Sequence, residues 1–242
     1  MLDESRFQIE SHSGATDTQY IENSIAIDGP TASGKSVIGR QLSLRLGIPF
    51  CDTGLMYRAA TLSVLQARIS PDNSLKVIEW LGNMDLDLHW DTPDTPVILL
   101  DSIPVNDKLR KPEIENMVSL IAKLPEVRSM LVARQRLVAS REAVIMVGRD
   151  IGRVVLPEAK TKIFLDASIE VRAARRHADQ IEAGQSMTVQ QVQEATSHRD
   201  QADDTGKRSI RPEQAADDAT VIFTDDSSER EVLAQCLGLY AK

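Results

Sequence analysis

The pattern G-x-x-x-x-G-K-S at residues 29–36 constrains the fold more than any other feature of the chain. It follows a short apolar run, residues 24–28, and opens an amphipathic run, residues 35–46, so its context is strand, loop and helix. Glycines let successive N–H groups point into one concavity at the positive end of a helix, which suits phosphate oxygens. A glycine turn that only begins a helix would need neither Lys35 nor Ser36. The pattern therefore predicts a phosphate-binding loop in an α/β fold.

The residues of this loop have expected roles at a nucleoside triphosphate. Lys35 would neutralise the β and γ phosphates, and the hydroxyl of Ser36 would bind the Mg²⁺ that bridges them. The loop by itself leaves ATP and GTP open as donors. The predicted nucleotide-binding residues are Gly29, Pro30, Thr31, Ala32, Ser33, Gly34, Lys35 and Ser36.

The remaining apolar patterns predict one parallel sheet with helices between its strands. Five short apolar runs are the expected strands: residues 24–28, 48–51, 143–147, 161–165 and 221–223. Helical patterns are expected at residues 35–46, 54–67, 112–123, 126–141, 169–183 and 188–202. Between them, residues 75–111 combine a short helix with alternating apolar positions, which predicts an inserted antiparallel patch.

The two least apolar segments are expected to lie outside the core. Residues 1–22 are polar and aperiodic, which predicts a disordered tail, with a docking segment as the alternative. Residues 203–212 are charged and carry few apolar anchors, so we expect them to move as part of a lid region at about 184–212. Nothing demands a second independent domain, and residues 23–242 are predicted to form one.

The overall charge limits the classes of partner. The chain has 36 Asp and Glu against 28 Lys and Arg, a net charge of -8, which disfavours nucleic acids and anionic membranes as partners. It has neither an apolar run of about 18 residues nor the apolar stretch of a secretory signal, so we expect a cytoplasmic protein. Cys51 and Cys236 lie far apart without metal or redox spacing, which predicts free thiols. We expect a monomer.

An acceptor for the transferred phosphate needs positive groups for an anion and polar groups for the rest of the molecule. Three patches supply them, at residues 52–58, 119–128 and 148–152. The last two lie at the ends of elements, where an open α/β sheet places its ligands. The residues alone show clustered binders of phosphate and hydroxyl groups.

In these stretches the chain resembles the bacterial cytidylate kinase family of P-loop nucleoside monophosphate kinases. The resemblance runs from about residue 25 to residue 240, through IAIDGPTASGKS, DTGLMYRAATL, LPEVRSMLVARQR, GRDIGRVVLPEA, KIFLDASIEVRAARR and HRDQADD. It implies a P-loop NTPase-type three-layer sandwich with a five-stranded parallel sheet, an inserted NMP-binding subdomain and a mobile lid. It also implies transfer of the γ-phosphate of ATP, with Mg²⁺, to CMP or dCMP in pyrimidine nucleotide metabolism.

The resemblance further implies roles for single residues. Arg58 and Arg149 would bind the acceptor phosphate, a task that suits the planar guanidinium. The residues implied to recognise cytosine are Ser119, Arg128 and Asp150; those implied to bind ribose are Arg199 and Asp203; and Thr53 and Tyr57 would complete the pocket wall. The residues implied to act on the transferred phosphate are Lys35, Arg149 and the lid arginine Arg208.

Other interpretations remain open at several of these residues. Arg172, Arg175 and Arg176 either touch ATP, with Arg175 the chosen candidate, or form a solvated helix face. Tyr57 is as compatible with a core side chain as with a ligand contact, and Ser119 with an ordinary exposed serine.

The chain departs from the family pattern at three places. Val147 replaces the usual acidic residue before G-R-D, Arg153 replaces a threonine after Gly152, and the compact D-x-x-R of the lid is stretched over residues 204–208. Val147 and the altered lid leave a catalytically weak nucleotide-binding regulator open as an alternative function. A P-loop kinase for another small acceptor, such as UMP or a metabolite, is a second alternative.

Overall fold

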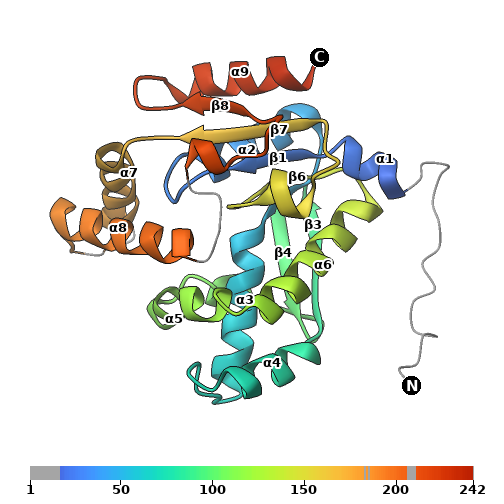
Figure 1. Cartoon of the computed structure of the whole chain (residues 1–242), viewed down its shortest axis with the longest axis vertical. Coiled ribbons are helices and arrows are strands. Elements are labelled where there is room, and N and C mark those ends of the chain that lie inside the picture. The colour runs from blue at the N-terminus through green and yellow to red at the C-terminus, as the bar shows by residue number, and fades with distance from the viewer. Residues whose placement is uncertain (1–16, 183, 185, 206–210, 242) are drawn as a thin grey trace.

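A five-stranded parallel sheet forms the centre of the computed structural model, which describes residues 17–182, 184, 186–205 and 211–241 (Figure 1). The strand order is β2-β6-β1-β7-β8, and every neighbouring pair is parallel. The strands are β1 Ile25–Asp28, β2 Phe50–Asp52, β6 Ile145–Val147, β7 Thr161–Asp166 and β8 Thr220–Phe223. The predicted sheet is confirmed, with each strand within two residues of its expected bounds.

Helices cover both faces of this sheet because its side chains alternate between two apolar clusters. Ile25 and Ile27 of β1 lie in the cluster that contains the buried faces of α2 (Lys35–Leu46) and α9 (Glu229–Tyr240). Ala26 lies in the opposite cluster, which holds α3 (Thr53–Gln66), α6 (Pro125–Arg141) and the π-helical turn η3 (Ile151–Val155). The fold is therefore the three-layer sandwich that the sequence resemblance implied.

The inserted segment forms a second, antiparallel sheet. The strands of this sheet are β3 Leu86–Thr92, β4 Thr95–Leu100 and β5 Ile103–Pro104. Helix α4, Ser74–Gly82, precedes them, and the 3-10 turn η2, Asn106–Lys108, follows them. The hairpin between β3 and β4 reaches back to β2, where the Phe50 N–H donates to the Pro93 carbonyl at 2.7 Å and the Trp90 indole donates to the Phe50 carbonyl at 2.6 Å. These bonds cover an edge of the central sheet, which would otherwise present unpaired backbone groups.

The beginning of the described chain corrects the expectation of a tail through residue 22. Residues Asp17–Glu22 form the short helix α1, which packs against α6. Ile21 lies in the core, 8% exposed, and the Glu22 carbonyl accepts the Lys160 N–H at 2.9 Å. Ile21 is the apolar side chain that docks this turn on the core. A single apolar position gives no helical pattern in the sequence. Residues 1–16 lie outside the described residues.

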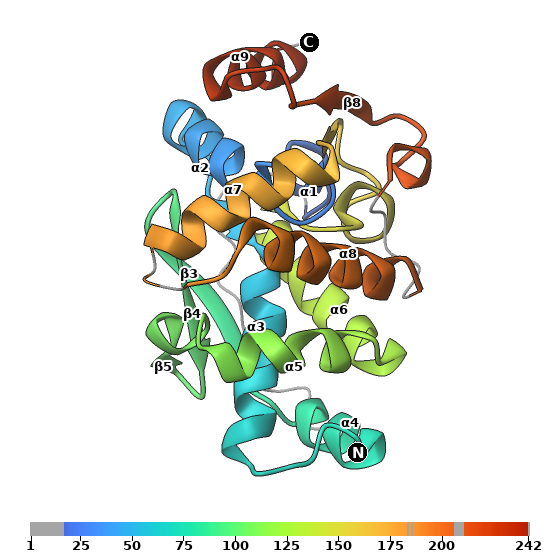
Figure 2. The same cartoon turned by 90° about the vertical axis from the view of Figure 1, so that its left-hand side faces the viewer.

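The remaining helices build one side of the molecule. They are α5 Pro112–Ala122, α7 Ile169–Glu182, α8 Val189–Thr205 and the 3-10 turn η4 Pro212–Gln214. Figure 2 shows α7 and α8 packed side by side, with α5 next to α8. The predicted helices agree with these bounds within three residues, whereas α9 was not predicted. In the part of the chain that the structure describes, no helix has the length and apolar character to cross a membrane.

Close packing of α2 on the sheet depends on Gly39. A Cβ at this position would lie 2.6 Å from Phe50 Cε2 and 2.9 Å from Val147 Cγ1. We expect Gly39→Ala to lower the free energy of unfolding by about 1–3 kcal/mol, since both neighbours are buried and have little room to move. Chemical denaturation measures the change.

A matched control is Gly238→Ala in α9, where a Cβ would meet nothing within 4 Å. This exposed helical position should gain about 0.5–1 kcal/mol from the better helix propensity of alanine. Equal effects of the two substitutions would contradict the packing argument.

Candidate functional site

The G-x-x-x-x-G-K-S loop is folded around its own lysine. Gly29 has a φ of 143°, and a Cβ there would lie 2.0 Å from the Leu165 carbonyl oxygen, so only glycine fits. Gly34 ends the loop with a φ of 96° as the N-cap of α2. The Lys35 ammonium is buried and donates to the Pro30 carbonyl at 2.5 Å and to Ser33 Oγ at 3.3 Å. Two oxygens of the loop therefore hold the Lys35 ammonium group inside it.

The charge of this ammonium depends on its surroundings. Burial and, after it, the neighbouring guanidinium of Arg149 lower the pKa of Lys35 to about 7, although Asp52 and Asp28 oppose the fall. An anion that arrives beside Lys35 would raise this pKa again, because a nearby negative charge favours the charged form of the lysine. A phosphate group is the anion that this loop geometry suits.

Two arginines of α7 brace the loop from outside. Arg172 is buried; it donates to the Thr31 carbonyl at 3.3 Å and to the Ala167 carbonyl at 3.0 Å. Arg175 donates to Thr224 Oγ1 at 2.9 Å and to the Thr224 carbonyl at 2.7 Å. The Thr224 hydroxyl in turn lies 3.5 Å from the Ser33 carbonyl. Neither side chain belongs to a solvated helix face, so that interpretation fails for Arg172 and Arg175.

Asp28 connects this loop to the acceptor patch that follows β6. Its two carboxylate oxygens accept the N–H groups of Ile151 at 2.6 Å and Gly152 at 2.8 Å. Asp28 is the last residue of β1, directly before Gly29, and is 3% exposed. Burial raises its pKa to about 6, although both hydrogen bonds oppose the rise. Sequence reasoning missed this residue; the available signal was a carboxylate at the end of a buried strand.

The predicted acceptor residues converge beside the loop from four elements. Arg149, which follows β6, donates to Asp203 of α8 through Nε at 2.9 Å and Nη2 at 2.7 Å. Arg128 of α6 pairs with Asp150. Burial lowers the pKa of Arg128, but Asp150, Tyr57 and Asp203 outweigh it and hold the pKa above its usual value. These five side chains therefore share one charged environment.

A second pair of arginines completes the cluster. Arg58 of α3 donates to Glu115 Oε1 through Nε at 2.9 Å and Nη2 at 2.7 Å, and Arg199 of α8 lies 3.5 Å from Glu115 Oε2. Burial and the charges of Arg149 and Arg58 lower the pKa of Arg199 to about 10. A cluster of guanidinium groups of this kind has the donors to bind an anion with several oxygens. Glu115 was not among the predicted residues.

The other predicted residues fall around this cluster. Thr53 is buried, and its hydroxyl donates to the Val147 carbonyl at 3.0 Å. Ser119 is half-buried on α5, one helical turn beyond Glu115 and so on the same side of that helix. Tyr57 is also half-buried, which fits its place beside Arg128. Arg208 lies outside the described residues.

Two of the departures from the family pattern have local explanations. Val147 is 1% exposed within the apolar cluster beneath α2, so its side chain packs against the core. Arg153 is exposed, and its guanidinium lies 3.5 Å from the Gln214 carbonyl. The side chain of Arg153 therefore extends toward η4.

A hydroxyl and a carboxylate stand together at the mouth of the loop. Ser36 Oγ donates to Asp52 Oδ2 at 3.2 Å. Both atoms are hard oxygen ligands of the kind Mg²⁺ accepts. Among the described residues no three His, Cys, Asp or Glu side chains gather as a metal site. A cation here would thus take its remaining ligands from water and phosphate, which is how Mg²⁺ usually binds with nucleotides.

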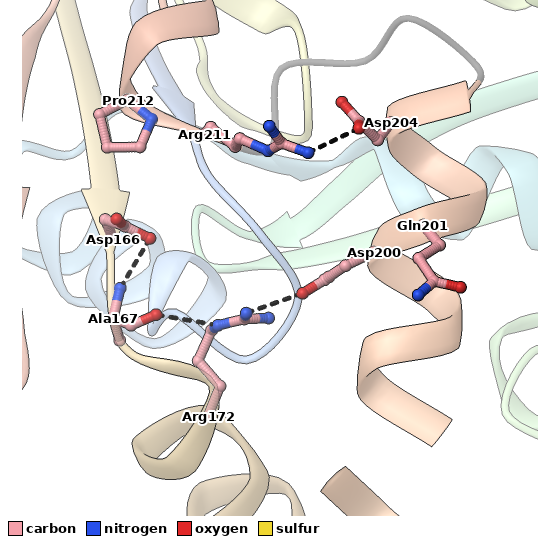
Figure 3. Close-up of a pocket in the computed structure, with 8 residues that line it drawn as sticks. All are labelled: Asp166, Ala167, Arg172, Asp200, Gln201, Asp204, Arg211 and Pro212. Carbon is pink, nitrogen blue, oxygen red and sulfur yellow. Dashed lines mark hydrogen bonds and ion pairs between the residues drawn. The ribbon is translucent and has the colours of Figure 1, made fainter. Parts of the chain in front are cut away.

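A cavity of about 300 Å³ opens between the end of β7 and α8. Figure 3 shows two ion pairs within it, Arg172 with Asp200 and Arg211 with Asp204, both at 2.7 Å. Arg172 also bonds the Thr31 carbonyl, so the cavity adjoins the phosphate loop. It is lined by Asp166, Ala167, Arg172, Asp200, Gln201, Asp204, Arg211 and Pro212. Sequence patterns gave no signal for most of these residues.

Comparisons with known proteins agree with this geometry. A family model described as cytidylate kinase matches residues 25–242. A cytidylate kinase of Caldanaerobacter subterraneus subsp. tengcongensis is 41% identical over 209 residues, 86% of this chain and 90% of the relative. One of Geobacillus sp. (strain WCH70) is 41% identical over 86% of this chain and 92% of its own. One of Bacillus thuringiensis (strain Al Hakam) is 37% identical over 89% and 95%.

The buried carboxylate of Asp28 should leave a signature in the pH dependence of stability. Its pKa of about 6 lies above the ordinary aspartate value of 3.8, so between these values the folded protein holds more protons than the unfolded chain. The contribution of Asp28 to the free energy of unfolding therefore falls as pH rises through this window, and Asp28→Asn abolishes that fall. From pH 4.5 to 7.5 we expect the variant to gain about 2 kcal/mol relative to wild type.

Urea unfolding at both pH values measures the difference. Asp179→Asn, at an exposed carboxylate, serves as the control and should give no such change. Parallel pH profiles for wild type and Asp28→Asn would contradict the assignment of a raised pKa to Asp28.

Proposed function

The chain belongs to the cytidylate kinase family, and we propose that it transfers the γ-phosphate of ATP to CMP or dCMP, giving CDP or dCDP. One observation carries the proposal: a phosphate loop and an arginine cluster lie side by side. The Asp28 carboxylate connects them, because Asp28 directly precedes the loop and accepts the N–H groups of Ile151 and Gly152. Residues at the carboxyl ends of β1, β2 and β6 build both parts, which is where an open parallel sheet binds ligands.

On the donor side, we assign the triphosphate of ATP to residues 29–36. The N–H groups at the start of α2 would meet its phosphate oxygens, and Lys35 would neutralise the β and γ phosphates. Ser36, together with Asp52, would hold Mg²⁺, which when bound neutralises charge that develops during transfer. The ATP contact expected of Arg175 stays a prediction, since its guanidinium is bound to Thr224.

On the acceptor side, the arginine cluster supplies groups for every part of a nucleotide. Arg58 and Arg149 would bind the phosphate of CMP. Ser119, with the pair Arg128 and Asp150, would recognise the cytosine edge. The residues assigned to ribose are Arg199 and Asp203, and those assigned to the pocket wall are Thr53 and Tyr57. The ion pairs of Arg149 with Asp203 and of Arg128 with Asp150 support the assignment. Arg208 is kept as the lid arginine on the resemblance alone.

The chemistry asks the protein mainly for alignment and charge neutralisation. The monophosphate is already a nucleophile at neutral pH, so no side chain has to remove a proton from it. Arg149 lies close enough to Lys35 to lower the pKa of the lysine, and a phosphoryl group passing between donor and acceptor would meet both side chains. The predicted lid at residues 203–212 lies partly outside the described residues; its closure, which stays a prediction, would exclude water that could hydrolyse ATP.

Two further expectations complete the proposal. We assign the protein to the cytoplasm as a monomer that acts on small substrates; the buried free thiols of Cys51 and Cys236 suit a reducing compartment. Val147 gives little support to the alternative of a weak nucleotide-binding regulator, because its side chain packs in the apolar cluster beneath α2. A kinase for UMP or another metabolite would have no need of the Arg128 and Asp150 pair.

Removal of the loop ammonium tests the function directly. We expect Lys35→Met to lower kcat by at least about 10³-fold, because electrostatic stabilisation of the transferred phosphate is lost. A coupled assay of ADP release with CMP, dCMP, UMP and AMP measures both the loss and the acceptor preference. Unchanged circular dichroism and melting temperature establish that the fold is intact. A normal rate with CMP in this variant, or a wild-type preference for UMP, would refute the proposal.

Recognition of the base is tested at Ser119. We expect Ser119→Ala to lower kcat/KM for CMP by about 3–10-fold, the effect of losing one hydrogen bond, with the KM for ATP unchanged. Ser129→Ala is the matched control, since the Ser129 hydroxyl donates only locally to the Pro125 carbonyl and is exposed. Equal kinetics for the two variants would remove Ser119 from the cytosine site.

A further inference from the structure

Glu115 lies where the acceptor phosphate is expected. It belongs to α5, and its side chain is 28% exposed. Its Oε1 accepts from Arg58 Nε at 2.9 Å and Nη2 at 2.7 Å, while its Oε2 lies 3.5 Å from Arg199 Nη1. One carboxylate thus joins two arginines of two different helices, α3 and α8.

The contact uses the donors that a phosphate would use. The Nε and Nη2 groups form one edge of the guanidinium, and this edge is the one that binds oxyanions in parallel hydrogen bonds. With Glu115 in place, the edge of Arg58 is filled. An arriving phosphate must displace the carboxylate or share Arg58 with it at the cost of repulsion between two anions.

The electrostatics of the cluster support this competition. Burial raises the pKa of Glu115, but Arg58, Arg199 and Arg176 outweigh it and hold the pKa below its usual value. The carboxylate is therefore charged at neutral pH, as a competitor of phosphate must be. Glu115 in turn favours the charged form of Arg199. Burial and the neighbouring arginines lower the pKa of Arg199 to about 10, and the carboxylate opposes that shift.

We propose that Glu115 is a specificity-determining residue that acts as a resident counter-ion in the acceptor-phosphate site. It rests on the proposed function for the identity of the acceptor, but the competition itself concerns any anion at Arg58. A phosphate monoester dianion carries enough charge to replace the carboxylate between Arg58 and Arg199. Anions of lower charge are rejected, and the empty site stays compensated.

Glu115→Gln tests the proposal, because glutamine keeps the shape and one acceptor oxygen but removes the charge. We expect the variant to bind inorganic phosphate and CMP about tenfold more tightly than wild type in calorimetry, with the affinity for cytidine unchanged. Its melting temperature without ligand should fall, since two arginines lose their partner, and added phosphate should raise it by more than in wild type.

Two further variants locate the effect. Glu113→Gln changes an exposed carboxylate on the same helix and should bind phosphate as wild type does. Adding Arg58→Met to Glu115→Gln should abolish the gain in phosphate affinity, which places the anion at Arg58. An equal gain for CMP and cytidine would show a rearranged pocket and would overturn the proposal.

The opposite outcome is equally clear. If Glu115 only positions Arg58 and Arg199, Glu115→Gln will bind phosphate and CMP as weakly as wild type or more weakly, and the proposal fails. Failure of the proposed function looks different, because wild type would then bind neither CMP nor cytidine. The comparison of phosphate binding between wild type and Glu115→Gln still decides the role of Glu115 in that case.

Discussion

The carboxylate of Asp28 holds two parts of the site in one position. It is the last residue of the central strand, and its oxygens bond two successive N–H groups of η3, at 2.6 and 2.8 Å. The phosphate loop begins at the next residue, and Arg149 and Asp150 directly precede η3. A donor loop and an acceptor segment that are 120 residues apart in the chain thus share one rigid connection, and phosphoryl transfer depends on such alignment.

Charge compensation is the second constraint on this site. Clustered arginines would repel one another in a protein without substrate, and partial burial makes that repulsion stronger. Three of them are each paired instead with a carboxylate: Arg58 with Glu115, Arg149 with Asp203, and Arg128 with Asp150. Under the proposed function, substrate binding would exchange partners within a balanced cluster.

The sequence predicted the parts of the fold that depend on local pattern. Patterns of neighbouring residues define the loop motif, the apolar strands and the amphipathic helix α2. Their predicted bounds therefore agree with the structure within a few residues. The acceptor residues were named through a family resemblance, and most of them do lie together. Features that arise only when distant segments meet were missed: α1 docks through Ile21, Asp28 bonds η3, and Glu115 meets Arg58 across two helices. No periodicity marks such pairs.

The acidic composition of the chain is compatible with the anionic substrates of the proposed reaction. A net charge of -8 opposes the approach of triphosphate over long distances, but salt screens that field beyond about 10 Å. Inside this range the local donors decide, and here they are N–H groups, one ammonium and several guanidinium groups. If Glu115 competes for Arg58 as proposed, weakly charged anions would gain little by entering the acceptor site. Selectivity for phosphate would then follow from competition within the site, which a merely basic surface would not provide.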